Sequence, residues 1–181
     1  MPRQIAFLRA INVGGHIVKM ERLKQLFESL KLKNVETFIA SGNVIFDSAR
    51  GKPDALERKI EEMLEKELGY EVKTFIRSDA ELAKIAAYRP PFDEASDTPA
   101  TRLFIGFLAT APGSETKAKL AAAATDVDDF HIDGRELYWR CRVASHESKF
   151  SGTLLEKTLG MATTLRNANT VQRLVAKYPP G

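Results

Sequence analysis

Polar and charged residues cluster just before two expected helices in the C-terminal part of the chain. Arg166-Asn167-Ala168-Asn169-Thr170 precedes one apolar-periodic run, and Ser148-Lys149 precedes another. The first N–H groups of a helix have no partner inside the helix, and the helix dipole adds partial positive charge, so helix starts attract anions. Lys149 and Arg166 would add formal charge, because an arginine can clamp a phosphate or carboxylate with two hydrogen bonds.

This cluster supplies half of the candidate ligand contacts, which are Ser148, Lys149, Arg166, Asn167, Asn169 and Thr170. An equally good interpretation is structural. In that case Asn167 caps the last helix and Arg166 is bonded to a backbone carbonyl.

A second polar cluster lies in the first half of the chain. Asn12-Val13-Gly14-Gly15 follows an expected strand and precedes a helix, as phosphate-cradling loops do, and Ser41-Gly42-Asn43 joins two expected strands. The loop lacks the signatures of a P-loop or a dinucleotide site, so a turn is the favoured interpretation of the two glycines and a hairpin is that of Ser41–Asn43. The candidate contacts here are Arg9, Asn12, Gly14, Gly15, Ser41 and Asn43.

Other catalytic patterns are missing. The three histidines, His16, His131 and His146, are scattered, and the single cysteine has no partner at metal-binding spacing, so we expect no metal and no cofactor. No nucleophile–base pair is evident, which leaves enzymatic activity uncertain. The acidic run from Asp126 to Asp129 lacks the spacing of a calcium loop and is expected to be a solvated turn.

One expected strand, 136–143, has two contrasting faces. Cys141 alternates with Leu137 and Trp139 and is expected to face a core, whereas Tyr138, Arg140 and Arg142 share the other face. An aromatic that shares a sheet face with arginines resembles a stacking platform for single-stranded nucleic acid. A solvated edge strand is the favoured interpretation.

Composition is that of a soluble globular protein. The 181 residues are 44% hydrophobic and 28% charged, and no apolar stretch approaches the roughly 20 residues that a spanning helix needs, so no membrane partner is expected. A single cysteine and the lack of a leader segment favour the cytoplasm. The net charge is +3, but from Arg135 onward there are 8 basic and 3 acidic residues, which would attract anions or nucleic acid.

The elements that must position these residues occur twice. Leu64-Glu65-Lys66-Glu67-Leu68-Gly69 is matched by Leu155-Glu156-Lys157-Thr158-Leu159-Gly160, and Ile5-Ala6-Phe7-Leu8 by Ile105-Gly106-Phe107-Leu108. Periodicity and capping signals predict, in the first half, strands at 4–10, 35–40, 44–47 and 72–76 and helices at 20–30, 53–68 and 78–87. In the second half they predict strands at 103–109, 127–132, 136–143 and 162–165 and helices at 114–124, 151–159 and 167–177.

This order predicts an α+β fold of two duplicated ferredoxin-like β-α-β-β-α-β subdomains, each with a trailing helix. The expected boundaries are residues 1–88, a linker rich in proline and acid at 89–101, and residues 102–181. In such a unit the end of the first strand lies beside the hairpin, and the start of the second helix lies beside the end of the fourth strand. Each half would thereby gather its polar cluster at one end, and the two clusters could face a single cleft between the halves.

The motifs also resemble a known family. Leu8-Arg9-Ala10-Ile11-Asn12-Val13-Gly14-Gly15, Ile39-Ala40-Ser41-Gly42-Asn43-Val44-Ile45-Phe46, Ser148-Lys149, Leu155–Gly160 and Arg166–Val171 together resemble the domain-of-unknown-function family numbered 1697. The resemblance implies a small bacterial-type protein of two similar α+β halves, and it implies no activity. Two residues depart from the pattern: Ala10 replaces the usual glycine, and Ala168 the usual tryptophan, which removes a ring that could stack on a ligand.

The leading hypothesis is a protein that binds a small anionic ligand, such as a nucleotide or phosphorylated metabolite, between the halves. The alternatives are a nucleic-acid binder that uses the basic C-terminal third and an enzyme of unknown reaction. The oligomeric state is not predicted.

Overall fold

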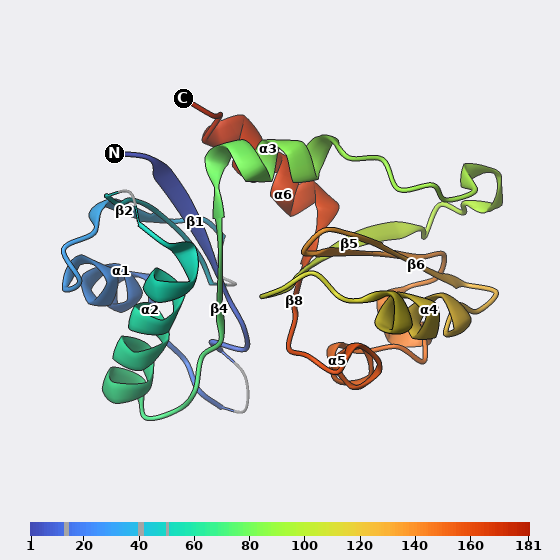
Figure 1. The fold of residues 1–181 in the computed structure, drawn as a ribbon, viewed down its shortest axis with the longest axis horizontal. Helices are drawn as coiled ribbons and strands as arrows, with labels where there is room; N and C mark the ends of the chain where they lie inside the picture. The colour runs from blue at the N-terminus through green and yellow to red at the C-terminus, as the bar shows by residue number, and fades with distance from the viewer. Residues whose placement is uncertain (13–14, 40–41, 50) are drawn as a thin grey trace. The chain divides into compact units, whose positions relative to one another are not determined.

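The fold is described by a computed structural model for residues 1–12, 15–39, 42–49 and 51–181 (Figure 1). These residues form two compact units, each an antiparallel four-stranded sheet covered by helices. The expected α+β class and the repeated β-α-β-β-α-β order are confirmed.

The first unit contains one sheet with the strand order β2-β3-β1-β4. The trailing helix that was expected after its fourth strand is present. Its elements are β1 (Arg3–Leu8), α1 (Met20–Glu28), β2 (Lys33–Thr37), β3 (Asn43–Asp47), α2 (Pro53–Leu68), β4 (Thr74–Ser78) and α3 (Asp79–Ala87).

The second unit repeats this arrangement with the order β6-β7-β5-β8. A short 3-10 helix, Glu94–Ser96, interrupts the expected linker, and another, Ser145–Glu147, precedes α5. The remaining elements are β5 (Arg102–Phe107), α4 (Ser114–Ala122), β6 (Asp128–Asp133), β7 (Glu136–Cys141), α5 (Gly152–Leu159), β8 (Thr164–Asn167) and α6 (Ala168–Lys177).

Local signals set several helix ends. Pro53 is the first residue of α2, and Gly69 ends that helix in the left-handed region at φ 83°. Ser78 and Glu81 form the expected capping box, since the Glu81 N–H donates to Ser78 Oγ at 3.1 Å and the Ser78 N–H to Glu81 Oε2 at 3.2 Å. Asn167 caps α6 by accepting from the Asn169 N–H at 2.9 Å.

The fourth strand of each unit begins two residues later than expected. In the first unit β4 starts at Thr74, which pairs with Leu8, the last residue of β1. Two residues further on, Ala10 adopts a positive φ of 56°, so the chain has turned away and offers no strand for Val72 to pair with. The start of β4 is therefore set by where its partner β1 ends, and the apolar run that begins at Val72 does not set it.

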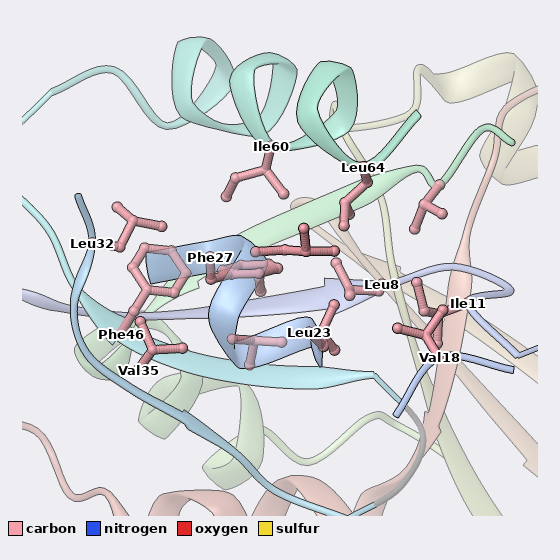
Figure 2. Close-up of a cluster of buried hydrophobic side chains, with 14 of the residues drawn as sticks. Leu8, Ile11, Val18, Leu23, Phe27, Leu32, Val35, Phe46, Ile60 and Leu64 are labelled. Atoms are coloured by element: carbon pink, nitrogen blue, oxygen red, sulfur yellow. The ribbon is translucent and has the colours of Figure 1, made fainter. Parts of the chain in front are cut away.

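The core of the first unit lies between its sheet and the helices α1 and α2. Figure 2 shows Ile60 and Leu64 of α2 pointing toward Phe27 of α1 and Leu8 of β1, and all four side chains are buried. Burial of each such side chain contributes about 1.5–3 kcal/mol, so this apolar layer accounts for much of the unit's stability.

The second unit has the equivalent core on the face of its sheet that α4 and α5 cover (Figure 1). Cys141, Leu137 and Trp139 lie in it, as the alternation along β7 predicts, and Cys141 is fully buried. The expectation of a solvated edge strand is wrong. β7 lies between β6 and β5, and on its other face Tyr138 is 1% and Arg140 5% exposed.

The acidic run that leads into β6 differs from expectation in part: Asp126 is exposed in a bend, as expected, whereas Asp128 and Asp129 belong to the strand. Asp128 is fully buried rather than solvated, because its carboxylate accepts from Trp139 Nε1 at 2.9 Å, Ser148 Oγ at 2.8 Å and Thr125 Oγ1 at 2.8 Å. Asp129 forms an ion pair with Arg142. The Asp128 carboxylate is thus hydrogen-bonded by a tryptophan N–H and two hydroxyls, where the sequence pattern predicted contact with solvent.

The unit boundaries differ from the expected 1–88 and 102–181. The boundaries fall inside α3 and α6, so each of these helices is shared: the first unit contains residues 1–84 and 174–181, and the second contains residues 85–173, including the whole expected linker. The chain end belongs to the first unit because Tyr178 packs edge-on against Phe38, with ring centroids 6.2 Å apart, and under the guanidinium of Arg3 at 5.5 Å.

Candidate functional site

The first-half polar residues lie where the topology places them, but they bond to their own loops. The Leu8 N–H donates to the Gly42 carbonyl at 2.9 Å, so the end of β1 meets the β2–β3 connection as expected. Asn12 Oδ1 accepts from the Val18 N–H at 2.8 Å. Asn43 is fully buried and donates from Nδ2 to the Phe38 carbonyl at 3.0 Å. Both asparagines therefore close turns.

The other first-half candidates add little to a site. Arg9 is half-buried, and its backbone N–H donates to the Lys73 carbonyl at 2.9 Å. Gly15 is exposed with φ 83°, which a turn requires. Gly14 and Ser41 lie outside the described residues.

Arg166 is buried in β8, at 8% exposure. Its Nη1 donates to Thr164 Oγ1 at 2.8 Å and to the Leu165 carbonyl at 2.9 Å. Burial lowers the pKa of the guanidinium to about 10, so it stays charged at neutral pH. The equivalent residue of the first unit, Arg77, is 1% exposed and donates from Nη1 to the Ile76 carbonyl at 2.9 Å. A buried arginine at the same place in both units favours the structural interpretation.

The two predicted charge clamps of the second half do not converge. Arg166 alternates with Leu165, which packs into the core beneath α4 and α5, so Arg166 faces the opposite side of the sheet. Lys149 is exposed, and its Nζ lies 5.4 Å from the ring centre of Phe150, a residue of that same core. Lys149 and Arg166 thus belong to opposite faces of the sheet.

The polar residues around these clamps are also used by the fold. Ser148 donates to the buried Asp128, and Asn167 caps α6. Asn169 is exposed and Thr170 half-buried in the first turn of α6. The shared cleft between the halves stays a prediction.

A pocket of about 630 Å³ lies at the opposite end of the first sheet from Asn12 and Asn43. It is formed where β1 begins, α1 ends and the chain passes from β3 into α2. Its residues are Pro2, Gln4, Leu30, Lys31, Leu32, Ser48, Ala49, Gly51, Lys52, Pro53, Ala55, Leu56, Lys59 and Ile76. We call it the lysine pocket.

The floor of the lysine pocket is apolar. Leu32 and Ile76 are buried members of the core cluster, and Leu30 and Leu56 pack against it half-exposed. A volume of this size is typical of small-molecule sites, which bury an apolar body and orient it through a few polar groups.

The rim of the lysine pocket is positive. Lys31, Lys52 and Lys59 are exposed, and none of them forms an ion pair with the residues that the structure describes. The described lining contains no aspartate or glutamate. Lys52 also stands at the N-terminus of α2, which has no side-chain cap there, so the partial positive charge of a helix 16 residues long adds to that of the lysines.

Sequence reasoning missed this pocket because its lysines come from separate segments. A signal does exist in α2. Lys52 and Lys59 are seven residues apart, two helical turns, with Leu56 between them, so they share one helix face. Lys31 joins them only through the packing of α1 beside α2.

Neither a metal-binding cluster nor a membrane-spanning helix is found among the described residues. They contain no group of three or more His, Cys, Asp or Glu side chains placed to hold a metal ion. No helix in the described ranges has the length and apolar character needed to cross a bilayer.

Comparison with known proteins identifies the family. Residues 1–138 match the family described as "Protein of unknown function (DUF1697)". The chain belongs to this family. The DUF1697 match ends before Ser148, so the motifs at 148–149, 155–160 and 166–171 lie outside the matched residues. No curated protein matches the chain.

The DUF1697 chain also resembles a solved structure, the conserved bacterial protein SP0830 from Streptococcus pneumoniae. The two are 23% identical, the alignment covers 98% of each chain, and the TM-score is 0.73. At this identity the similarity establishes a common fold over the whole length, including the C-terminal motifs beyond residue 138.

Proposed function

We propose that this protein binds a small organic anion with an apolar body, and that the lysine pocket is the site. The observation that carries the proposal is the pairing of an apolar floor with Lys31, Lys52 and Lys59 and no acidic residue in the described lining. This refines the sequence-based hypothesis of a small anionic ligand and moves it from a cleft between the halves into the first unit.

The chemistry of the pocket favours amphipathic anions over plain ones. Exposed lysine–carboxylate pairs contribute only about 0.2–1 kcal/mol each, so an anion without an apolar part would bind weakly. Each buried CH₂ group adds about 0.8 kcal/mol. A carboxylate or phosphate that carries an alkyl chain would use both the floor and the rim.

Isothermal titration calorimetry with decanoate tests this. We expect saturable binding that weakens about 15-fold when the chain is shortened to octanoate, since two CH₂ groups are lost. Acetate, which has the charge without the chain, and 1-decanol, which has the chain without the charge, should both bind more weakly than decanoate.

Two variants test whether decanoate binds in the lysine pocket. Lys52→Ala/Lys59→Ala should weaken decanoate binding about 2- to 30-fold through the loss of two exposed pairs. Lys66→Ala removes one lysine charge from the last turn of α2, away from the pocket, and should leave binding unchanged. Equal affinity in the double variant and the wild type, or no binding of decanoate at millimolar concentration, would rule out the proposal.

Nucleic-acid binding through the basic C-terminal third stays a prediction, and the geometry lends it less support. Arg140 and Arg142 form ion pairs with Asp97 and Asp129, so their charges are compensated before a phosphate could approach.

A further inference from the structure

A second cavity, of about 380 Å³, lies within the second unit on the sheet face turned away from α4 and α5. Leu103, Ile105, Tyr138 and Arg140 contribute its sheet side. Residues 88–98, which we call the strap, follow α3 and form a second wall, and Ala168 and Gln172 of α6 contribute to the lining.

The strap is held to the sheet at several points. Tyr88 Oη and His131 Nε2 lie 2.7 Å apart, at hydrogen-bond distance. Arg140 donates from Nη2 to the Asp93 carbonyl at 2.8 Å and forms an ion pair with Asp97. Thr98 Oγ1 donates to the Arg142 carbonyl at 2.6 Å. These contacts within the chain fix the wall, and a preformed wall lowers the entropic cost of binding.

Aromatic rings line this cavity. The rings of Tyr88 and Tyr138 have centroids 5.1 Å apart, and the Phe92 ring lies 5.5 Å from the guanidinium carbon of Arg140. All four residues belong to the lining. Rings of this kind favour flat, polarisable ligands, because a planar heterocycle can stack on an aromatic face or an arginine plane.

The charges of the lining cancel. Arg89 and Arg140 are matched by Glu94 and Asp97, so the cavity offers no net attraction to anions, in contrast to the lysine pocket. Hydrogen-bonding groups remain in the lining. Gln172, Arg89 and Glu94 are exposed, and within the described part of the chain their side chains form no hydrogen bond.

Arg140, which lines the cavity, carries one donor that has no partner among the described residues. It is 5% exposed, and its Nε is buried with no hydrogen-bond partner among the described residues. An unpaired buried donor is costly, and a ligand acceptor that reached it would remove that cost.

We propose that this cavity binds an uncharged planar heterocycle with hydrogen-bonding edges, of the nucleoside class. Stacking on Phe92 and Tyr88 would select the flat ring, and Gln172 would select its polar edge. The volume falls within the usual range for small-molecule sites. This site is independent of the lysine pocket and does not rest on the proposed binding of organic anions.

Saturation-transfer NMR with adenosine, guanosine, cytidine and uridine is the first test, followed by titration of whichever nucleoside responds. We expect a nucleoside to bind with an affinity that hardly changes between low and high salt, because neither the ligand nor the lining carries net charge. A nucleoside monophosphate that binds much more tightly, with strong salt dependence, would overturn the proposal and point to an anion site. No saturation transfer from any nucleoside at millimolar concentration would also overturn it.

Three variants test whether the nucleoside binds in this cavity. Gln172→Ala changes an exposed residue and should weaken binding about two- to tenfold through the loss of a hydrogen bond. Phe92→Leu keeps an apolar contact but removes stacking, and should weaken binding at least about fivefold. Gln25→Ala, an exposed glutamine of α1, is the matched control and should bind as the wild type does.

The lysine-pocket variant separates the two sites. Lys52→Ala/Lys59→Ala should leave nucleoside affinity unchanged. If Gln172→Ala and Phe92→Leu, both folded by circular dichroism, bind the nucleoside as tightly as the wild type, the cavity is not the site.

Discussion

At the residue scale, polar side chains that suggest a ligand site serve the fold instead. Asn12 and Asn43 close turns in the first unit, and Ser148 bonds to the buried Asp128 of the second. Ser148 is central to its loop, because its Oγ also accepts from the Phe150 N–H at 3.0 Å and so brings Phe150 to the core. The Asp128 carboxylate in turn depends on its donors, since a buried charge without hydrogen bonds is costly.

Ser148→Ala should therefore destabilise the protein. Removing one donor from the buried Asp128 should lower the free energy of unfolding by about 1–3 kcal/mol, measured by urea denaturation. Ser145→Ala, at an exposed position of the same loop, should change it by less than about 0.5 kcal/mol. Equal stability of Ser148→Ala and the wild type would leave Ser148 free for a ligand.

At the element scale, α2 protects the edge of the first sheet. β4 is an edge strand, and its outward N–H groups at Thr74 and Ile76 donate to Glu61 Oε1 at 3.1 Å and Glu57 Oε1 at 3.0 Å. The two glutamates are four residues apart and so lie on one helix face. Unpaired edge N–H groups are templates for aggregation, and these carboxylates occupy them.

Glu57→Ala should destabilise the protein at this sheet edge. The amide of Ile76 would lose its buried acceptor, so we expect a loss of about 1–3 kcal/mol in the free energy of unfolding. Hydrogen–deuterium exchange should be faster at Ile76 in this variant. Glu62→Ala, an exposed glutamate on the same helix, is the control and should leave both measurements unchanged.

At the scale of the whole molecule, both units hold their tyrosines in environments that oppose ionisation. The chain has four tyrosines, and burial raises the pKa of each, Tyr70, Tyr88, Tyr138 and Tyr178, with that of Tyr178 reaching about 12. Further contributions come from Asp133 at Tyr88 and from Glu136, Asp133 and Tyr88 at Tyr138. The folded protein therefore binds phenolic protons more tightly than the unfolded chain does.

This predicts a loss of stability in alkali. A pKa raised above the ordinary value of 10 stabilises the fold fully below pH 10, and the contribution falls as the pH rises from 10 toward 12 and beyond. Phenolate absorbance should show no tyrosine titrating at 10 in the native protein and all four near 10 in urea. Tyr178→Phe should reduce the decline in unfolding free energy over this window. A native tyrosine that ionises at its ordinary pKa would contradict the expectation.

Features that depend on near neighbours in the chain can be predicted from the sequence. Pro53, Gly69 and the Ser78–Glu81 capping box fix helix ends through contacts within a few residues, and the alternation along β7 assigns Cys141 to a core. The repeat predicted two β-α-β-β-α-β units for the same reason, since the order of elements is a local property.

Burial and pockets could not be predicted from the sequence, because they depend on the packing of segments that are distant in the chain. Tyr138 and Arg140 have the pattern of an exposed platform, yet residues 85–97 cover them through Ile85, Asp93 and Asp97. Lys31 meets Lys52 and Lys59 at one rim only when α1 and α2 have packed on the sheet. Periodicity can assign a side chain to a face, but it carries no information about which distant segment covers that face.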